Sequence, residues 1–192
     1  EIYALQGDVL SFRAGVSVGL EPVSVAYDGD GQAWVVNQLS DSVSIVDLGE
    51  QPRVIQSLQV GDEPRDIIFA GSNGNRAFIS AARRGQNHPE FNPVELRTAG
   101  NGQADIWVFD ASNPGSGFGG TPVEIITLFS TPVRALASNA DGSEIYAMPF
   151  LSGNQSTVVN RFSVLDGATP DKPAPDANFE SIPAPSTGLI VQ

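Results

Sequence analysis

Short runs in which apolar and polar residues alternate recur along the chain, and turns rich in glycine, aspartate and asparagine separate them. Residues 42–47 read Ser-Val-Ser-Ile-Val-Asp, so Val43 and Ile45 would face one side of a strand and the two serines the other. The turn Asp-Gly-Asp-Gly at 28–31 suits a tight hairpin. No window of about 11 residues shows convincing helical periodicity. The pattern therefore predicts an all-β protein.

These runs belong to a sequence motif that recurs along the chain, which we call the repeated phrase. VGLEPVSVAYDGDGQAWVVN begins at Val18, VGDEPRDIIFAGSNGNRAFISA at Val60 and STPVRALASNADGSEIYAMP at Ser130, and a fourth version, IPAPSTGLIVQ, begins at Ile182. In each of the first three, a proline precedes a short strand, a turn, and a second strand that carries an aromatic residue. The shared prolines are Pro22, Pro64, Pro132 and Pro185. Such self-similarity indicates a repeat architecture.

Each repeat is expected to contain four short strands. The expected strands are 23–27, 33–37, 42–47 and 53–60 in the first repeat, 65–69, 76–81, 105–110 and 123–128 in the second, and 133–138, 144–148, 158–165 and 179–182 in the third. Four strands in each repeat is the composition of a β-propeller blade. A two-sheet sandwich would also contain short strands, but it would not repeat one phrase. We therefore predict a β-propeller of four-stranded antiparallel blades.

The blade boundaries follow from the repeats. We expect a partial blade over 1–18, blades over 19–60, 61–128 and 129–182, and the first strand of a next or composite blade over 183–192. Within 1–18, strands are expected at 1–4, 8–12 and 14–18. The two ends could combine into one blade and close a four-bladed ring. We favour a segment of a larger ring. Because an open array exposes strand edges, such a segment requires a partner surface, supplied by the remaining blades or domains of a longer chain or by another protein.

The repeats resemble the YVTN-type propeller repeats of bacterial periplasmic and surface proteins. The residues that match are the VG-x-E-P opening, WVVN at 34–37 and SVSIVD at 42–47. WVVN departs from Y-V-T-N at its first and third positions, and FISA at 78–81 and YAMP at 146–149 depart further. The resemblance extends over nearly the whole chain and implies a periplasmic, cell-surface or secreted bacterial protein. Related propellers include lactonases, amine-dehydrogenase subunits, cytochrome-linked proteins and adhesins, so the fold leaves the function open.

The composition narrows the classes of molecule that the chain is expected to bind. The net charge is −12, with 22 acidic against 10 basic residues. A chain so acidic is a poor partner for nucleic acid or anionic lipid, since both are themselves polyanionic. The chain has no cysteine, so it lacks thiolate metal ligands and the C-x-x-C-H haem attachment motif. No apolar run reaches the roughly 18 residues of a membrane helix, and no membrane span is predicted.

The second repeat carries an insertion, AARRGQNHPEFNPVELRTAGNGQ, at 81–103. A loop this long between two strands is expected either to bind or cover something or to pack on its own blade. It holds the only histidine, His88, with Glu90 and Glu95 nearby. Imidazole and carboxylates can bind divalent metals, but one histidine without ligand spacing does not indicate a metal site. We predict neither a metal nor another cofactor.

The charges of VGDEPRDIIF would lie where the chain crosses a propeller face toward the central channel. Simple solvation of these charges is the alternative to ligand binding. The candidate binding residues from this phrase, the insertion and the third repeat are Asp62, Glu63, Arg65, Asp66, Arg83, Arg84, His88, Glu90 and Arg134.

The sequence favours a non-catalytic binding or scaffold module of a larger exported bacterial protein, and no catalytic residue is assigned. A propeller enzyme or an electron-transfer companion is the alternative. Its active centre would lie at the channel mouth, and the available residues are Arg65, Asp66, His88 and Arg134. A surface adhesin that binds its ligand through the 81–103 loop is a third hypothesis.

Overall fold

The computed structural model describes residues 1–92, 94, 102, 104–129, 131–151, 157–159 and 189–191. These residues form β-strands joined by turns, with a short 3-10 turn η1 (Ser72–Gly74) and no α-helix among them. The described residues also hold no helix that could cross a membrane. The chain divides into two compact units, 1–150 and 151–192. The described part of the smaller unit includes β13 (Thr157–Val159) paired antiparallel with β14 (Leu189–Val191).

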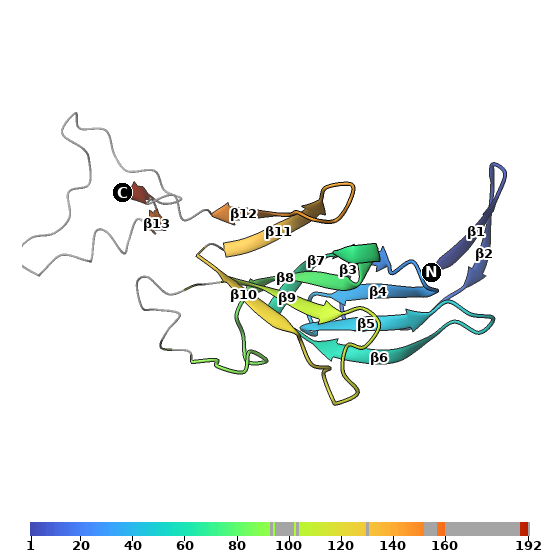
Figure 1. Ribbon diagram of the computed structural model, residues 1–192, viewed down its shortest axis with the longest axis horizontal. Helices are drawn as coiled ribbons and strands as arrows, with labels where there is room; N and C mark the ends of the chain where they lie inside the picture. Colours follow the sequence, from blue (N-terminus) through green and yellow to red (C-terminus); the bar gives the residue numbers. More distant parts are fainter. Residues whose placement is uncertain are drawn as a thin grey trace, which may run out of the picture. The chain divides into compact units, whose positions relative to one another are not determined.

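Two four-stranded antiparallel sheets, each paired in chain order, dominate the larger unit (Figure 1). The first sheet consists of β3 (Pro22–Tyr27), β4 (Gln32–Asn37), β5 (Ser42–Asp47) and β6 (Arg53–Gln59). The second consists of β7 (Asp62–Ala70), β8 (Arg76–Arg83), β9 (Ala104–Asp110) and β10 (Glu124–Leu128). Two hairpins accompany them, β1 (Ile2–Gln6) with β2 (Val9–Ala14), and β11 (Thr131–Ser138) with β12 (Ile145–Leu151).

The prediction of four strands in each of the first two repeats is confirmed, and so is the hairpin at 28–31. Its turn is closed by Asp28, whose Oδ1 accepts hydrogen bonds from the backbone N–H groups of Asp30 and Gln32 at 2.8 and 3.0 Å. Aspartate closes turns in this way because its short side chain reaches the backbone two residues ahead. Hydrogen bonds within the turn therefore account for the hairpin between β3 and β4.

Several boundaries differ from expectation. The N-terminal segment forms two strands rather than three, and the expected strand at 14–18 is wrong, since residues 15–18 lie outside any strand. β8 runs through Arg83, so the insertion begins at 84 rather than 81. In the third repeat, β13 covers the start of the expected strand 158–165, and the expected strand 179–182 lies outside the described residues.

The repeated phrase builds the same backbone twice. The glutamate before each proline has a positive φ, 54° at Glu21 and 50° at Glu63. A register shift follows each proline, between Pro22 and Ser24 in β3 and between Pro64 and Asp66 in β7. Left-handed backbone at a residue other than glycine is uncommon. Its recurrence at equivalent positions shows that the phrase encodes one specific entry into the first strand of each sheet.

The glycine of the repeated phrase is required by the way in which the chain enters each sheet. A Cβ at Gly19 would lie 2.6 Å from Asn37 Cγ, and a Cβ at Gly61 would lie 2.8 Å from Ala81 Cβ. Asn37 and Ala81 are themselves the strand partners of Pro22 and Pro64. The chain therefore enters each sheet in close contact with the end of the second strand, where only glycine fits.

Successive sheets pack face to face. One core cluster joins Trp34, Val43 and Leu58 of the first sheet to Ile79 and Phe109 of the second, and each of these residues is at most 1 % exposed. A second cluster joins the other face of the second sheet to β11 and β12. The first strands are neighbours as well, because β7 contacts both β3 and β11. The second sheet is thus covered on both faces.

Candidate functional site

Asp66 lies in β7, where the first strands of the three repeats, β3, β7 and β11, meet. Its Oδ1 accepts hydrogen bonds from Ser24 Oγ of β3 at 2.8 Å and from the N–H of Ile67 at 2.9 Å. Its Oδ2 accepts the N–H of Leu136 in β11 at 2.9 Å. Ser80 Oγ in turn accepts the Asp66 N–H at 3.1 Å. The predicted binding residue Asp66 therefore uses both carboxylate oxygens to hold neighbouring sheets together.

The acidic residues before Asp66 are held by a residue that the sequence did not single out, Asp41. Its Oδ1 accepts the N–H of Glu63 at 2.9 Å, and its carbonyl oxygen accepts the N–H of Val60 at 3.0 Å. Glu63 forms an ion pair with Arg65. Burial raises the pKa of the Asp62 carboxyl above its ordinary value, and the neighbouring Asp41 raises this pKa further. The phrase at 60–66 is thus an ordered polar structure at the junction of the two sheets.

Arg134 lies apart from this group. Its guanidinium carbon stands 4.8 Å from the centre of the Phe150 ring in β12. Arg134 occupies the second position after Pro132, as Ser24 and Asp66 do after Pro22 and Pro64. Because Arg134 is exposed and stacked on an aromatic ring, it belongs to the surface of the β11–β12 hairpin.

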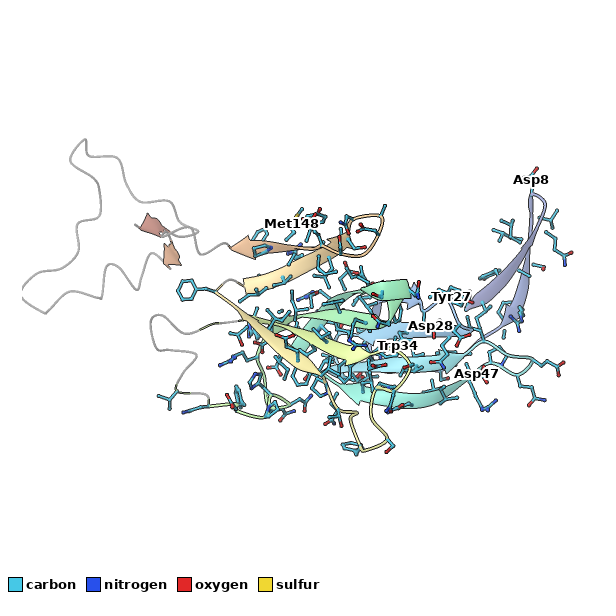
Figure 2. The ribbon with its side chains drawn as sticks, viewed as in Figure 1. Asp8, Tyr27, Asp28, Trp34, Asp47 and Met148 are labelled. Carbon is cyan, nitrogen blue, oxygen red and sulfur yellow. The ribbon has the colours of Figure 1, made fainter. Side chains whose placement is uncertain are left out.

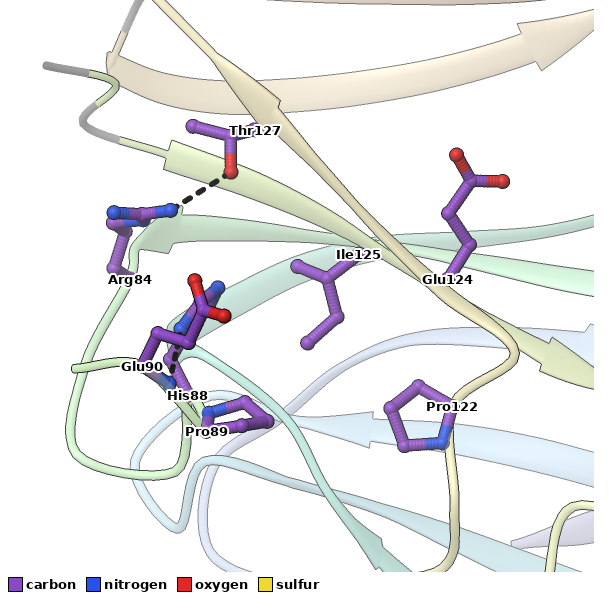
Figure 3. Close-up of a pocket in the computed structure, with 8 residues that line it drawn as sticks. All are labelled: Arg84, His88, Pro89, Glu90, Pro122, Glu124, Ile125 and Thr127. Atoms are coloured by element: carbon purple, nitrogen blue, oxygen red, sulfur yellow. Dashed lines mark hydrogen bonds between the residues drawn. The ribbon is translucent and has the colours of Figure 1, made fainter.

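A hollow of about 340 Å³ opens beside the segment that follows β8 (Figure 3). The hollow lies between this segment and β10. The residues that line it are Arg84, His88, Pro89, Glu90, Pro122, Glu124, Ile125 and Thr127. The structure thus brings together three predicted site residues, Arg84, His88 and Glu90. Arg83, the exposed last residue of β8, does not line the hollow, and neither does any candidate from Asp62 to Asp66.

A tight turn fixes His88. The His88 N–H donates to Gly85 O at 3.2 Å, and Nδ1 accepts the Glu90 N–H at 3.1 Å. Because Nδ1 is an acceptor, the proton of the neutral imidazole lies on Nε2. Nε2 is 3.9 Å from Asp105 Oδ2, too far for a hydrogen bond. His88 is 8 % exposed, and its ring stands edge-on to Trp107 with ring centres 6.2 Å apart.

Asp105 is the buried centre of this group. It is fully buried at the start of β9. Its Oδ1 accepts a hydrogen bond from Thr127 Oγ1 at 2.9 Å and lies 3.5 Å from Arg84 Nε. Arg84 Nη2 also donates to Thr127 Oγ1 at 3.0 Å. A buried carboxylate is costly unless charge and hydrogen bonds compensate it. Here Arg84 and Thr127 do so at Oδ1, whereas the buried Oδ2 accepts no hydrogen bond within the described part of the chain. Asp105 was not among the predicted site residues, although an acid inside an otherwise apolar strand was a usable signal.

The chemistry of the hollow is polar and mixed in charge. Arg84 and His88 form its inner wall, and the exposed Glu90 and Glu124 contribute carboxylates. Within the described residues, no three His, Cys, Asp or Glu side chains are placed to hold a metal ion. Glu95, which the sequence grouped with His88, lies outside the described residues. Of the residues proposed for a channel-mouth active centre, only His88 lines the hollow.

The comparisons with known proteins bear on the fold alone. The chain matches no protein-family model and no curated protein. It is similar in structure to a functionally unknown protein from Desulfotomaculum acetoxidans DSM 771, with a TM-score of 0.51 and 14 % sequence identity. The similarity covers 77 % of this chain and 43 % of that one. This chain therefore matches less than half the length of its structural neighbour.

Proposed function

We propose that the chain is a segment of a β-propeller of the YVTN type that acts as a non-catalytic binding or scaffold module in a larger exported bacterial protein. The observation that carries the proposal is the repeated entry at Glu21-Pro22 and Glu63-Pro64, with the same positive φ and the same register shift. Each entry leads into the first strand of a four-stranded antiparallel sheet, as in a propeller blade.

The adjacency of the first strands supports a radial arrangement. β7 contacts β3 on one side and β11 on the other, and Asp66 links all three by hydrogen bonds. In a propeller the first strands of the blades surround a central axis, so equivalent residues of successive repeats become neighbours. Ser24 and Asp66 are such a pair, since each is the second residue after its proline.

The use of the polar residues supports a binding or scaffold role. Asp66, Asp105 and Asp41 are candidates for chemistry by residue type, yet their carboxylates accept hydrogen bonds from neighbouring strands and segments. The residues considered for a lactonase-like centre are spread over β7, the segment that follows β8, and β11. A catalytic centre requires its groups to converge on one reacting atom, so the scaffold role is favoured.

A metal-binding and activity test separates these functions. The purified chain is incubated with Ca²⁺, Mn²⁺ or Zn²⁺, desalted, analysed for bound metal and assayed with simple lactones. We expect no metal at one per chain and no hydrolysis above that of buffer. A stoichiometric metal that His88→Ala removes and Gln86→Ala retains would favour the enzyme, because Gln86 is an exposed neighbour in the same turn.

The radial arrangement has its own test. Because the chain has no cysteine, pairs of cysteines can be introduced and spin-labelled, one pair on the first strands (Val23 and Arg65) and one on the last strands (Ser57 and Glu124). Blades that diverge from an axis give a longer distance for the second pair than for the first. Equal distances would indicate parallel layers about 10 Å apart and would contradict a propeller.

A further inference from the structure

His88, the only histidine, faces a carboxylate oxygen that has no hydrogen bond. Asp105 uses Oδ1 for both Thr127 and Arg84, whereas its buried Oδ2 accepts nothing within the described part of the chain. His88 Nε2 lies 3.9 Å from this Oδ2. A buried polar atom without a partner is uncommon in native proteins. A movement of the ring by about 1 Å would bring Nε2 within hydrogen-bond distance of Oδ2.

The neutral His88 ring is held by its own turn. We call residues 85–91 the His88 turn, in which Gly85 O accepts the His88 N–H at 3.2 Å and His88 O accepts the Phe91 N–H at 3.0 Å. Across this turn, His88 Nδ1 accepts the Glu90 N–H at 3.1 Å (Figure 3). A ring nitrogen that accepts a hydrogen bond carries no proton. The Glu90 N–H therefore fixes both the tautomer of the ring and its orientation.

Protonation would change both contacts of the ring in the same direction. An imidazolium carries a proton on each nitrogen, so Nδ1 would face the Glu90 N–H as a second donor and their hydrogen bond would be lost. At the other nitrogen, a neutral donor would become a charged one opposite Asp105. Charge-assisted hydrogen bonds are shorter and stronger than neutral ones, and salt screens them little at a buried site. One proton thus releases the ring from Glu90 and draws it toward Asp105.

The charged groups around the His88 turn come from every element packed against it, and acidic groups outnumber basic ones. Arg83 and Arg84 oppose a further positive charge, and Arg84 already lies beside Asp105. The negative charge near His88 compensates an imidazolium in this buried position. The carboxylates are Glu90 of the turn, Asp105 of β9, Glu124 of β10, Asp62 of β7, which contacts Gly85, and Asp41, whose carbonyl oxygen accepts Asn87 Nδ2.

We propose that His88 is an acid-triggered switch. On protonation its ring leaves the Glu90 N–H and pairs with Asp105 Oδ2, and the His88 turn opens at Glu90. Histidine is the side chain whose charge ordinarily changes between about pH 5 and 8, so a modest acidification operates the switch. His88, Pro89 and Glu90 all line the hollow, so acidification adds a positive charge to its wall and moves that wall. The switch depends on this cluster alone and is independent of the propeller assignment.

Nuclear magnetic resonance of the natural chain follows the switch directly, because a single histidine gives imidazole signals without ambiguity. At about pH 8 we expect the ¹⁵N chemical shifts of a bare Nδ1 and a protonated Nε2. As the pH falls to about 5, we expect the protection of the Glu90 amide against hydrogen exchange to fall by about tenfold or more, after correction for the pH dependence of exchange itself. This loss should share its midpoint with protonation of the ring.

Three substitutions assign the switch. His88→Asn cannot titrate but keeps an acceptor for the Glu90 N–H, since asparagine accepts from the backbone two residues ahead, so Glu90 should stay protected at every pH. Asp105→Asn removes the partner of the imidazolium, and we expect about tenfold less imidazolium at a given pH than in the natural chain. Glu124→Gln is the matched control. It removes an exposed carboxylate from the same hollow, and at about 0.15 M salt we expect a change of less than about twofold.

The buried Trp34 (Figure 2) and Trp107 give near-ultraviolet circular dichroism signals that verify folding of each variant. The natural chain and His88→Asn decide the question even if Asp105→Asn does not fold.

Any of four results would overturn the inference. The first two are a neutral ring with its proton on Nδ1, and a Glu90 amide that stays protected after the ring is charged. The third is loss of Glu90 protection in His88→Asn over the same pH range, which would assign the trigger to one of the surrounding carboxylates. The fourth is an effect of Asp105→Asn no larger than that of Glu124→Gln, because the imidazolium would then pair elsewhere.

Discussion

Ser24 Oγ donates a hydrogen bond of 2.8 Å to Asp66 Oδ1, and these two residues hold equivalent positions in successive repeats, 42 residues apart. The bond crosses from the first strand of one sheet to the first strand of the next. The other oxygen of Asp66 continues the link to Leu136 in β11. A half-buried carboxylate thus ties together three sheet elements that the apolar clusters hold by packing alone.

Replacing Asp66 should loosen the stack. We expect Asp66→Ala to lower the free energy of unfolding by about 2–3 kcal/mol, since it leaves the Leu136 N–H without its acceptor, and Ser24→Ala to lower it by about 1 kcal/mol. Urea unfolding measures both. The double variant should cost little more than Asp66→Ala alone, because the two share one bond. Strict additivity of the two losses would contradict this coupling.

The glycine of the repeated phrase should be intolerant of a methyl group. Gly61→Ala would place Cβ 2.7 Å from Arg83 O, so we expect a loss of about 1–3 kcal/mol in the free energy of unfolding. Gly15→Ala is the control, since nothing lies within 4 Å of its Cβ, and we expect a change within about 0.5 kcal/mol. Thermal unfolding compares the two, and equal effects would argue against the close contact.

The core between the sheets should respond to truncation. Leu58 is fully buried between the two sheets, and Leu58→Ala is expected to cost about 2–5 kcal/mol through lost burial and a residual cavity. Leu39 is 67 % exposed, so Leu39→Ala should change the free energy of unfolding by less than about 0.5 kcal/mol. Denaturant midpoints for both variants test the assignment, and a mild effect of Leu58→Ala would indicate that the two sheets do not pack as described.

Asp62 should make stability depend on pH. Burial raises the pKa of the Asp62 carboxyl in the folded chain above its ordinary value, and the neighbouring Asp41 carboxylate raises this pKa further. The contribution of Asp62 to the free energy of unfolding is therefore fully present below the unfolded pKa and is lost as pH rises through the folded pKa. We therefore expect Asp62→Asn to be more stable than the natural chain near pH 7 and to lose this advantage on acidification. Urea midpoints measured from about pH 7 down to acidic pH test this expectation. Asp8→Asn, a substitution in an exposed turn, is the control. An advantage that persists at low pH would point to another cause.

Much of the strand order was predictable, because its causes are local. Alternation of apolar and polar residues specifies a strand whose two sides differ, and β5 occupies the predicted range 42–47. Glycine and aspartate specify the turns between strands, as Asp28 does between β3 and β4. Where local signals are weak, the prediction failed, as it did at 14–18.

The candidate site was predicted by residue type but not by arrangement. Arg84, His88 and Glu90 do share one hollow. Asp105, which lies at the centre of their polar contacts, was missed, because its partners Arg84 and Thr127 lie 21 residues before it and 22 residues after it in the chain. Nothing in the sequence around Asp105 indicates which side chains will face it.

Most strands, their hairpins and the repetition could be inferred from the amino-acid sequence, since each depends on residues close together in the chain. Which polar groups meet depends instead on the tertiary structure. Ser24 reaches Asp66 across 42 residues, and Asp66 reaches Leu136 across 70. Such contacts depend on how one sheet is offset against the next, and that offset is set by the packing of whole apolar faces rather than by any short segment.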